Sequence, residues 1–163
     1  MGTKKAFENI SIFDLDGCLI KSNSSFLFAK YLYKKRVISL FSICFCYFTA
    51  FLYSFKFITQ LDRLHKLVFR YVLKNLEKKL LEDQAKIFWQ LYFDDLVYAP
   101  AYERLKNALK ERHFVAIFSS SPEYLVKEVS SYFKVPGYVA SEYSADSNGY
   151  LDEITTVIDG KMK

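Results

Sequence analysis

Two aspartates, Asp14 and Asp16, stand one residue apart where an apolar segment of the chain ends. That segment, residues 9–15, includes Ile10 and Ile12 and is typical of a buried, central β-strand. A buried carboxylate destabilises a protein unless it is paired, hydrogen-bonded or bound to a metal, and two neighbouring carboxylates repel each other. We therefore expect a functional site, rather than folding alone, to require both residues here.

The spacing of the two aspartates suits a reaction at phosphorus. Side chains of a strand alternate with period two, so Asp14 and Asp16 extend to the same side of the chain. Together they can bind one divalent cation, and Mg²⁺ is the best match because it combines a few carboxylates with water and phosphate. One aspartate can then attack an electrophilic phosphorus atom while the other transfers a proton. The alternative is that both are turn and cap residues beside Gly17.

A run of serines follows a second apolar segment. Residues 114–118 are typical of a buried parallel strand, and Ser119, Ser120 and Ser121 come directly after it. The next helix is expected to begin at Pro122, with Ser121 as its N-cap. Hydroxyl groups beside the free N–H groups of a helix N-terminus form an anion site. Serines are common in plain loops, and these matter because they lie one strand after the aspartates.

The elements around these residues indicate an α/β fold. Helical spacing dominates residues 22–98, Pro100 opens another helix, and residues 137–141 read as a further strand before a turn at 146–149. This order predicts right-handed βαβ units on a parallel sheet, with one core and one helical excursion. Ligands bind beyond the carboxyl ends of such strands, where the aspartates and serines would converge.

Composition indicates a single core with an unevenly charged surface. Of the 163 residues, 52% are hydrophobic and 18% aromatic, which is enough for a sizeable core. The net charge is +5, and residues 22–98 alone hold 12 Lys and Arg against 6 Asp and Glu. The basic excess therefore belongs to the helical excursion.

The helical excursion contains a long apolar segment. Residues 37–55 include 15 apolar residues among 19 and no charge, and they lie between the basic residues 34–36 and Lys56. This length is near the ~20 residues of a bilayer-spanning helix. Two interpretations stay open: a re-entrant or interfacial helix that contacts anionic lipid headgroups, or helices that pack on each other within the excursion.

The remaining residues that could do chemistry do not form a second site. The basic stretch 74–79 is typical of a solvated helix face, and no aromatic platform on a strand accompanies it, so we expect no nucleic acid as a partner. His65 and His113 are isolated, His65 on a helix face, and Trp89 is spaced as a core residue. The aspartates and serines therefore remain the candidate site.

Several motifs in order resemble the haloacid dehalogenase superfamily of phosphatases. They are residues 13–17, the helical excursion, residues 116–123, Glu142 with the turn at 146–149, and residues 160–163. Within that superfamily the chain is similar to subfamily IB, the branch that includes phosphoserine phosphatase. The resemblance implies a Rossmann-like core built from residues 1–21 and 99–163, with residues 22–98 as an inserted all-helical cap.

The resemblance also implies roles for individual residues. Asp14 would be the nucleophile that forms an aspartyl-phosphate, and Asp16 the general acid and base. Asp14 and the Asp16 carbonyl oxygen would ligate Mg²⁺. Ser119 would hold the phosphoryl oxygens, with the Ser120 backbone N–H beside it. Lys163 best fits the lysine that offsets charge between phosphate and nucleophile, and Lys161 is the second candidate.

The sequence departs from the family pattern at two places. Cys18 stands where the family usually has threonine, which keeps the size and weakens a hydrogen bond. The family's fourth motif, an acidic pair that completes the metal site, would follow the lysine, and the sequence ends at Lys163. We therefore expect a core whose C-terminal part is missing, weak Mg²⁺ binding, and a 163-residue form whose activity needs its own test.

The resemblance leaves the substrate open. The basic, apolar cap is similar to that of phosphatidylglycerophosphate phosphatases, which implies a lipid phosphate and a protein of the cytoplasm that associates with the inner face of a membrane. One alternative is a soluble phosphatase of the phosphoserine type, acting on a phosphorylated small molecule. Another is an inactive, truncated member that serves as a membrane-binding or partner-binding module. A phosphotransferase would differ only in the acceptor that attacks the intermediate.

Overall fold

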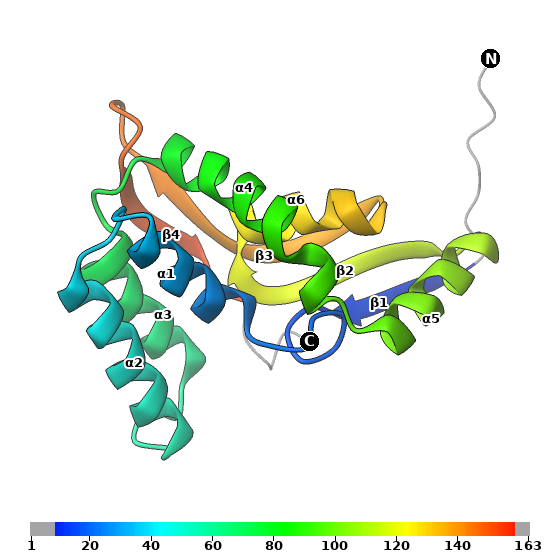
Figure 1. The fold of residues 1–163 in the computed structure, drawn as a ribbon, viewed down its shortest axis with the longest axis horizontal. Coiled ribbons are helices and arrows are strands. Elements are labelled where there is room, and N and C mark those ends of the chain that lie inside the picture. The colour runs from blue at the N-terminus through cyan, green and yellow to red at the C-terminus, as the bar shows by residue number, and fades with distance from the viewer. Residues whose placement is uncertain (1–8, 159–163) are drawn as a thin grey trace.

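The computed structural model describes residues 9–158 and contains helices and strands in the order of an α/β protein. Strand β1 comes first, a helical stretch follows, and β2, β3 and β4 close the described chain (Figure 1). The elements are β1 (Ile10–Asp14), α1 (Ser24–Lys34), α2 (Leu40–Ser54), α3 (Leu61–Val68), the π-helical turn η1 (Phe69–Leu73), α4 (Lys78–Leu96), α5 (Ala99–Lys110), β2 (Phe114–Pro122), α6 (Glu123–Phe133), β3 (Gly137–Ala145) and β4 (Leu151–Thr156).

The four strands form one mixed sheet in the order β1-β2-β3-β4. The first three are mutually parallel, and Asp14 at the end of β1 pairs with Phe118 in β2. Strand β4 runs antiparallel to β3 because the predicted turn at 146–149 folds the chain back, with Gly149 at φ +88°. The predicted α/β architecture with parallel βαβ units is confirmed.

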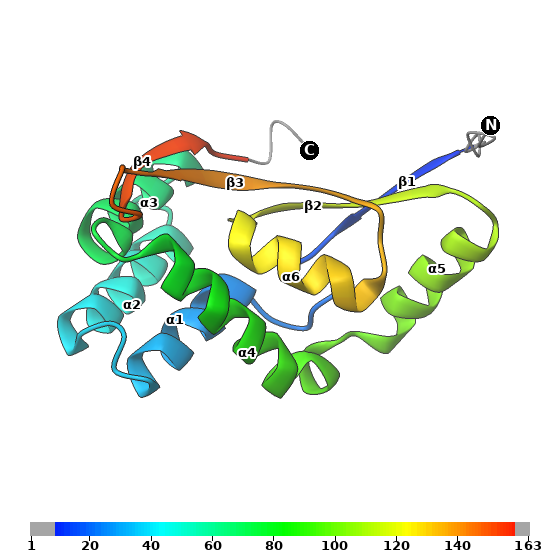
Figure 2. The same ribbon diagram turned by 90° about the horizontal axis from the view of Figure 1, so that it is seen from above.

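The expectation that β1 is a buried, central strand is wrong for this structure. Among the described strands β1 lies at the edge of the sheet, and the side chains of Ile10 and Ile12 are 72% and 64% exposed. Helices α5 and α6 both lie on one side of the sheet (Figure 2). The exposed side chains of Ile10 and Ile12 belong to the other side, where no helix within residues 9–158 covers them. An apolar run predicts a strand, but it does not reveal what covers each face of that strand.

The helical excursion gathers at one end of the molecule and returns to the core through α4. Helices α1, α2 and α3 lie together at that end, and α4 runs beside α6 (Figures 1 and 2). Trp89 of α4 is fully buried, as predicted, and its indole N–H donates to the Leu125 carbonyl of α6 at 3.0 Å. Phe28 of α1 meets Phe88 of α4 with ring centroids 5.5 Å apart. One continuous aromatic core therefore joins the excursion to the sheet.

The apolar segment 37–55 forms α2, a helix of 15 residues that begins after Ser39, whose side chain caps the Ser42 N–H. Neither α2 nor any other helix within residues 9–158 combines the length and the hydrophobicity needed to cross a bilayer.

Candidate active site

A tight turn after β1 sets the relative positions of the two aspartates. The Gly17 N–H donates to the Ile20 carbonyl at 2.8 Å, and the Ile20 N–H donates to the Leu15 carbonyl at 2.9 Å. Gly17 has φ +74°, a left-handed conformation that glycine adopts without the steric cost of a side chain. The turn therefore places Asp14 at the end of the strand and Asp16 at the start of the loop that leads to α1.

Both aspartates are half-buried, and Asp16 is held by two other segments of the chain. One carboxylate oxygen of Asp14 accepts the Leu15 N–H at 2.8 Å. In Asp16, Oδ1 accepts the Ser24 N–H at 2.7 Å and Oδ2 accepts the Ser121 hydroxyl at 2.6 Å. Ser24 is the first residue of α1, and a helix N-terminus favours negative charge. The Asp16 carboxylate is thus fixed between the start of α1 and the end of β2.

Three serines form a hydroxyl cluster behind the Asp16 carboxylate. The Ser121 oxygen lies 2.7 Å from the Ser25 hydroxyl and 3.2 Å from the Ser24 hydroxyl. Because the single hydroxyl proton of Ser121 goes to Asp16, Ser24 and Ser25 act as donors toward it. The sequence reasoning missed Ser24 and Ser25, although the polar run at residues 22–25 was the signal that could have found them.

The prediction that Ser121 caps the following helix is wrong. Strand β2 continues through Ser121 to Pro122, and α6 begins at Glu123 without a side-chain cap. A cap would use the Ser121 oxygen as an acceptor, but this oxygen instead accepts the hydroxyls of Ser24 and Ser25 while its proton goes to Asp16, 105 residues away in the sequence.

The other predicted phosphate-binding serines lie at the same end of the sheet. Ser119 follows Phe118, the register partner of Asp14, and is fully buried, with its oxygen accepting the Ser121 N–H at 3.1 Å. The Ser120 carbonyl accepts the Ser141 hydroxyl at 2.9 Å. The predicted charge-offsetting lysines, Lys163 and Lys161, lie outside the described residues. The structure thus brings the aspartates and serines to one strand end, as the topology predicted.

The donor set at this strand end consists of oxygen atoms. Within the described residues no group of three or more His, Cys, Asp or Glu side chains could hold a metal ion. One carboxylate and one carbonyl oxygen are nevertheless a sufficient protein share of a Mg²⁺ site, because Mg²⁺ keeps several waters and binds substrate phosphate. Asp14 and the Asp16 carbonyl therefore fit a magnesium ion that is shared with water and substrate.

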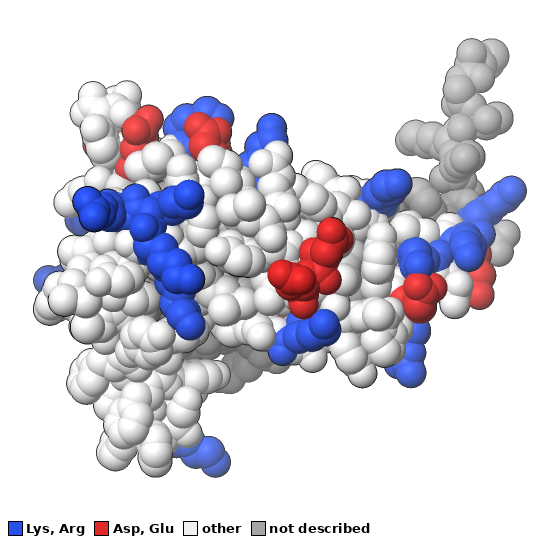
Figure 3. All heavy atoms as spheres, in the orientation of Figure 1, with Lys and Arg blue, Asp and Glu red and all other residues white. Residues whose placement is uncertain are grey.

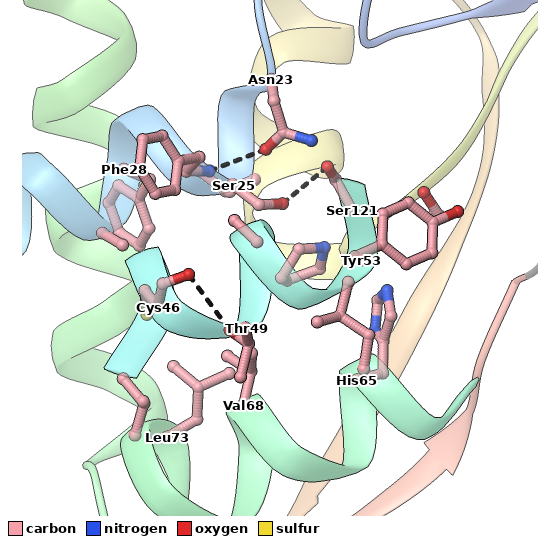
Figure 4. A pocket seen from close by; sticks show the side chains of 18 of the residues that line it. Asn23, Ser25, Phe28, Cys46, Thr49, Tyr53, His65, Val68, Leu73 and Ser121 are labelled. Carbon is pink, nitrogen blue, oxygen red and sulfur yellow. Dashed lines mark hydrogen bonds between the residues drawn. The ribbon is translucent and has the colours of Figure 1, made fainter. Parts of the chain in front are cut away.

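A pocket of about 450 Å³ opens beside this strand end. Ser25 and Ser121 lie at the top of Figure 4, whereas Val68 and Leu73 lie at the bottom. His65 also lines the pocket, a position that its isolated place in the sequence did not indicate, and its Nδ1 lies 3.2 Å from the Tyr143 hydroxyl.

Burial shifts the pKa of both groups of this pair. It lowers the pKa of His65, with a smaller opposing effect from Asp62, and it raises the pKa of Tyr143. Both side chains therefore favour their neutral forms, and the pair brings no formal charge into the pocket near pH 7.

Solved structures share this fold at low sequence identity. A protein of unknown function from Bordetella pertussis Tohama I matches with TM-score 0.75 and 12% identity over 90% of this chain and 67% of its own. A phosphoserine phosphohydrolase-like protein from Francisella tularensis subsp. tularensis SCHU S4 matches with TM-score 0.64 and 21% identity, over 90% of this chain and 64% of its own. Phosphoserine phosphatase from T. onnurineus matches with TM-score 0.59 and 13% identity, over 94% and 67%. The chain thus spans about two thirds of these proteins' lengths.

The family of the protein is identified by comparison of its sequence. No curated protein matches it significantly. The profile of the family described as haloacid dehalogenase-like hydrolase matches residues 12–161, from the strand that carries the aspartates almost to the end of the chain. The chain therefore belongs to the haloacid dehalogenase-like hydrolase family.

Proposed function

We propose that this protein is a Mg²⁺-dependent phosphomonoester hydrolase of subfamily IB that works through an aspartyl-phosphate. Residues 1–21 and 99–163 would form its core, and residues 22–98 its cap. One observation carries the proposal: the Asp16 carboxylate is held by the Ser24 N–H and the Ser121 hydroxyl two residues from Asp14. A proton carrier fixed beside a nucleophile is what a two-step phosphoryl transfer needs.

In this proposal each residue has one task. The Asp14 carboxylate attacks phosphorus, and the ester oxygen leaves with a proton from Asp16. Asp16 then takes a proton from water, which attacks the aspartyl-phosphate and releases inorganic phosphate. Ser119 and the Ser120 N–H hold phosphoryl oxygens, and Lys163, with Lys161 as second candidate, offsets their charge. Bound Mg²⁺ would neutralise the negative charge that gathers between phosphate and carboxylate.

The test is turnover of p-nitrophenyl phosphate by the 163-residue protein. We expect turnover that rises with Mg²⁺ and stops with EDTA, and loss of that turnover in Asp14→Asn. Asp94→Asn, at an exposed position of α4, is the matched control and should keep the wild-type rate. The proposal fails if the folded protein shows no metal-dependent turnover at any Mg²⁺ concentration, or if Asp14→Asn is fully active.

Two substrate classes compete within this proposal. The fold that the chain shares with phosphoserine phosphatase supports a phosphorylated small metabolite. The apolar segment 37–55 supports a lipid phosphate such as phosphatidylglycerophosphate, with a cap of the type found in phosphatidylglycerophosphate phosphatases. The same segment supports a cytoplasmic protein held at the inner face of a membrane.

A second candidate function, a membrane-binding module without catalysis, is favoured by the outer face of α2. Phe41, Phe48 and Phe51 are 67%, 56% and 52% exposed on this helix. The 45 residues from 17 to 61 contain six Lys or Arg and no Asp or Glu. Figure 3 shows the end of the molecule that holds α2 as mostly uncharged surface bordered by basic side chains. Exposed aromatic rings flanked by basic residues suit an anionic lipid surface.

Sedimentation with vesicles of phosphatidylglycerol and phosphatidylcholine tests this second candidate. We expect the protein to bind anionic vesicles in low salt, to lose binding in the triple variant Phe41→Ser, Phe48→Ser and Phe51→Ser, and to keep it in Asp14→Ala. Tyr98→Ser with Tyr150→Ser removes exposed aromatic rings elsewhere and should leave binding intact. Equal binding by the triple variant would exclude α2 as the membrane surface.

A further inference from the structure

The pocket beside the strand end is large enough for an organic group and is enclosed by distant parts of the chain. Its volume of about 450 Å³ falls within the range of small-molecule sites. Helices α1, α2 and α3, the turn η1 and the ends of β2 and β3 all contribute to its lining. Figure 4 shows Phe28 of α1, Cys46 and Thr49 of α2, and Leu73 of η1 among the side chains that line it.

Among residues 9–158, no charged side chain lines the pocket. The lining from this part of the chain holds no Asp, Glu, Lys or Arg, and most of it is aliphatic or aromatic, including Phe26, Leu32, Ile38 and Val68. The one histidine, His65, is kept neutral near pH 7 by burial. An ammonium or carboxylate group that entered this pocket would lose its water without gaining a partner of opposite charge. The lining therefore disfavours the zwitterionic end of an amino-acid phosphate.

The buried polar atoms of the lining already have partners. The Thr49 hydroxyl donates to the Phe45 and Cys46 carbonyls of its own helix, and His65 pairs with Tyr143. No buried side-chain nitrogen or oxygen in residues 9–158 lacks a hydrogen-bond partner. A ligand thus gains little from polar groups inside this pocket and gains more from apolar surface.

The Ser121 side chain lies between the pocket and the catalytic strand end. Its hydroxyl contacts the Asp16 carboxylate at 2.6 Å, and the same residue lines the pocket beside Ser25 and Ser120. A phosphate held at Asp14 would therefore direct its ester group toward apolar walls.

Helix α2 indicates the source of that ester group. Its inner side, with Cys46, Thr49 and Ala50, lines the pocket, whereas Phe48 and Phe51 face solvent on the same helix. A wall that is apolar on both sides, within 45 residues that hold no acidic side chain, suits an apolar ligand taken from an anionic lipid surface.

We propose that this pocket binds the alkyl or acyl chain of a phosphate monoester whose phosphate lies at the Asp14–Asp16 strand end. The inference rests on the proposed hydrolase function and selects a lipid-like substrate over a phosphoserine-like one.

Calorimetric binding of n-alkylphosphonates tests the chain directly, because their phosphorus–carbon bond resists hydrolysis. We expect affinity for the protein with Mg²⁺ to rise roughly fourfold per methylene from butyl- to octylphosphonate, all below their micellar concentrations. The phosphoserine-like probe 2-amino-3-phosphonopropionate should bind no tighter than methylphosphonate. A flat chain-length dependence overturns the proposal, and so does tighter binding of 2-phenylethylphosphonate than of octylphosphonate, which would indicate a ring site.

Two pocket-filling variants and one control variant distinguish the pocket from other apolar surfaces. Ala50→Trp fills the pocket from α2, and we expect it to lose the chain-length dependence while it keeps methylphosphonate binding. Ala29→Trp fills the pocket from α1 and provides the same test if the first variant does not fold. Cys44→Trp adds the same side chain at an exposed position of α2 and should bind octylphosphonate as the wild type does. An unchanged chain-length dependence in a folded pocket-filled variant overturns the proposal.

Failure of the two proposals can be told apart. Metal-dependent turnover of p-nitrophenyl phosphate combined with a flat phosphonate series would remove the chain site and leave the hydrolase. A steep phosphonate series in a protein without phosphatase turnover would remove the hydrolase and support the pocket as a binding site for apolar phosphates.

Discussion

The strand end and the pocket beside it are built in opposite ways. At the strand end, Asp14, Asp16 and the three serines at 119–121 come from two short stretches, and each position matters for its polar atoms. In the pocket, side chains from α1, α2, α3, η1, β2, α6 and β3 line the cavity, and most of them are apolar. The residues proposed to do the chemistry can therefore be found in short stretches of the sequence. The ligand that the pocket accepts depends instead on how the whole helical excursion folds.

The largest expected effect is a loss of turnover at the strand end that leaves ligand binding in the pocket unchanged. Asp16→Asn keeps the shape of the side chain and removes its ability to carry a proton, so turnover should fall by about 10²–10⁴. Octylphosphonate binding should stay close to wild type, because the pocket does not require that proton. Steady-state kinetics and calorimetry on the same preparation provide both values. A variant that loses binding and turnover together would show that the two regions are one site.

The next largest effect is on the stability of the core that supports both regions. Trp89→Ala removes the buried ring that joins α4 to α6 together with its hydrogen bond to Leu125, and should lower the free energy of unfolding by about 3–5 kcal/mol. Urea unfolding followed by circular dichroism measures the change. Leu91→Ala, at an exposed position of the same helix, should change it by about 0.5 kcal/mol or less. Two separate unfolding transitions in Trp89→Ala would mean that the excursion and the sheet are independently stable.

A smaller effect is expected at the residue where the regions meet. Ser121→Ala removes the hydroxyl that Asp16, Ser24 and Ser25 share, which should cost about 1–3 kcal/mol of stability and slow turnover. Ser130→Ala removes a buried hydroxyl that bonds only within α6, and should leave turnover unchanged. If both variants affect turnover equally, the hydroxyl cluster is structural and does not orient Asp16.

The smallest effect belongs to the pocket alone. Burial lowers the pKa of His65 from the usual 6.5, so below that pH the unfolded chain binds a proton that the folded chain resists. Stability should therefore fall as pH decreases through 6.5 and below, and this fall should be shallower in His65→Asn. Urea midpoints from pH 7.5 to 5.5 measure the difference. Identical profiles in the two proteins would contradict the assigned pKa direction of His65.

The sequence predicted the strand end well because the signals there are local. The apolar runs, the aspartate pair and the turn at 146–149 all report structure within a few residues, and the order of elements then placed them on one sheet. The hydrogen bond of Ser121 to Asp16 was not predicted because the two residues lie 105 positions apart, and no local rule favours that partner over a helix cap. The exposure of Ile10 and Ile12 was not predicted because the apolar pattern of a strand does not specify which face of the sheet is covered.

The pocket could not be predicted from the sequence. The pattern indicated helices over residues 22–98, and five helical elements between Ser24 and Leu96 agree with it. Nothing in that pattern specifies that Ala50, Val68 and Leu73 face a common cavity, since a helical repeat marks the apolar side without naming what it faces. The size of the aromatic rings and the angles at which the helices cross decide whether these apolar faces pack into a solid core or leave a cavity between them.

The hydrogen bond between Ser121 and Asp16 joins residues that lie 105 positions apart in the sequence. It closes a loop that contains the whole helical excursion, and joining chain ends so far apart carries an entropy cost that only later contacts offset. Single helices form through local contacts at lower entropic cost. The pocket, however, also needs Tyr124 and Tyr143, which follow Asp16 by more than 100 residues. The reactive groups and the pocket therefore depend on the same long-range closure, and a chain with its separate helices alone carries neither.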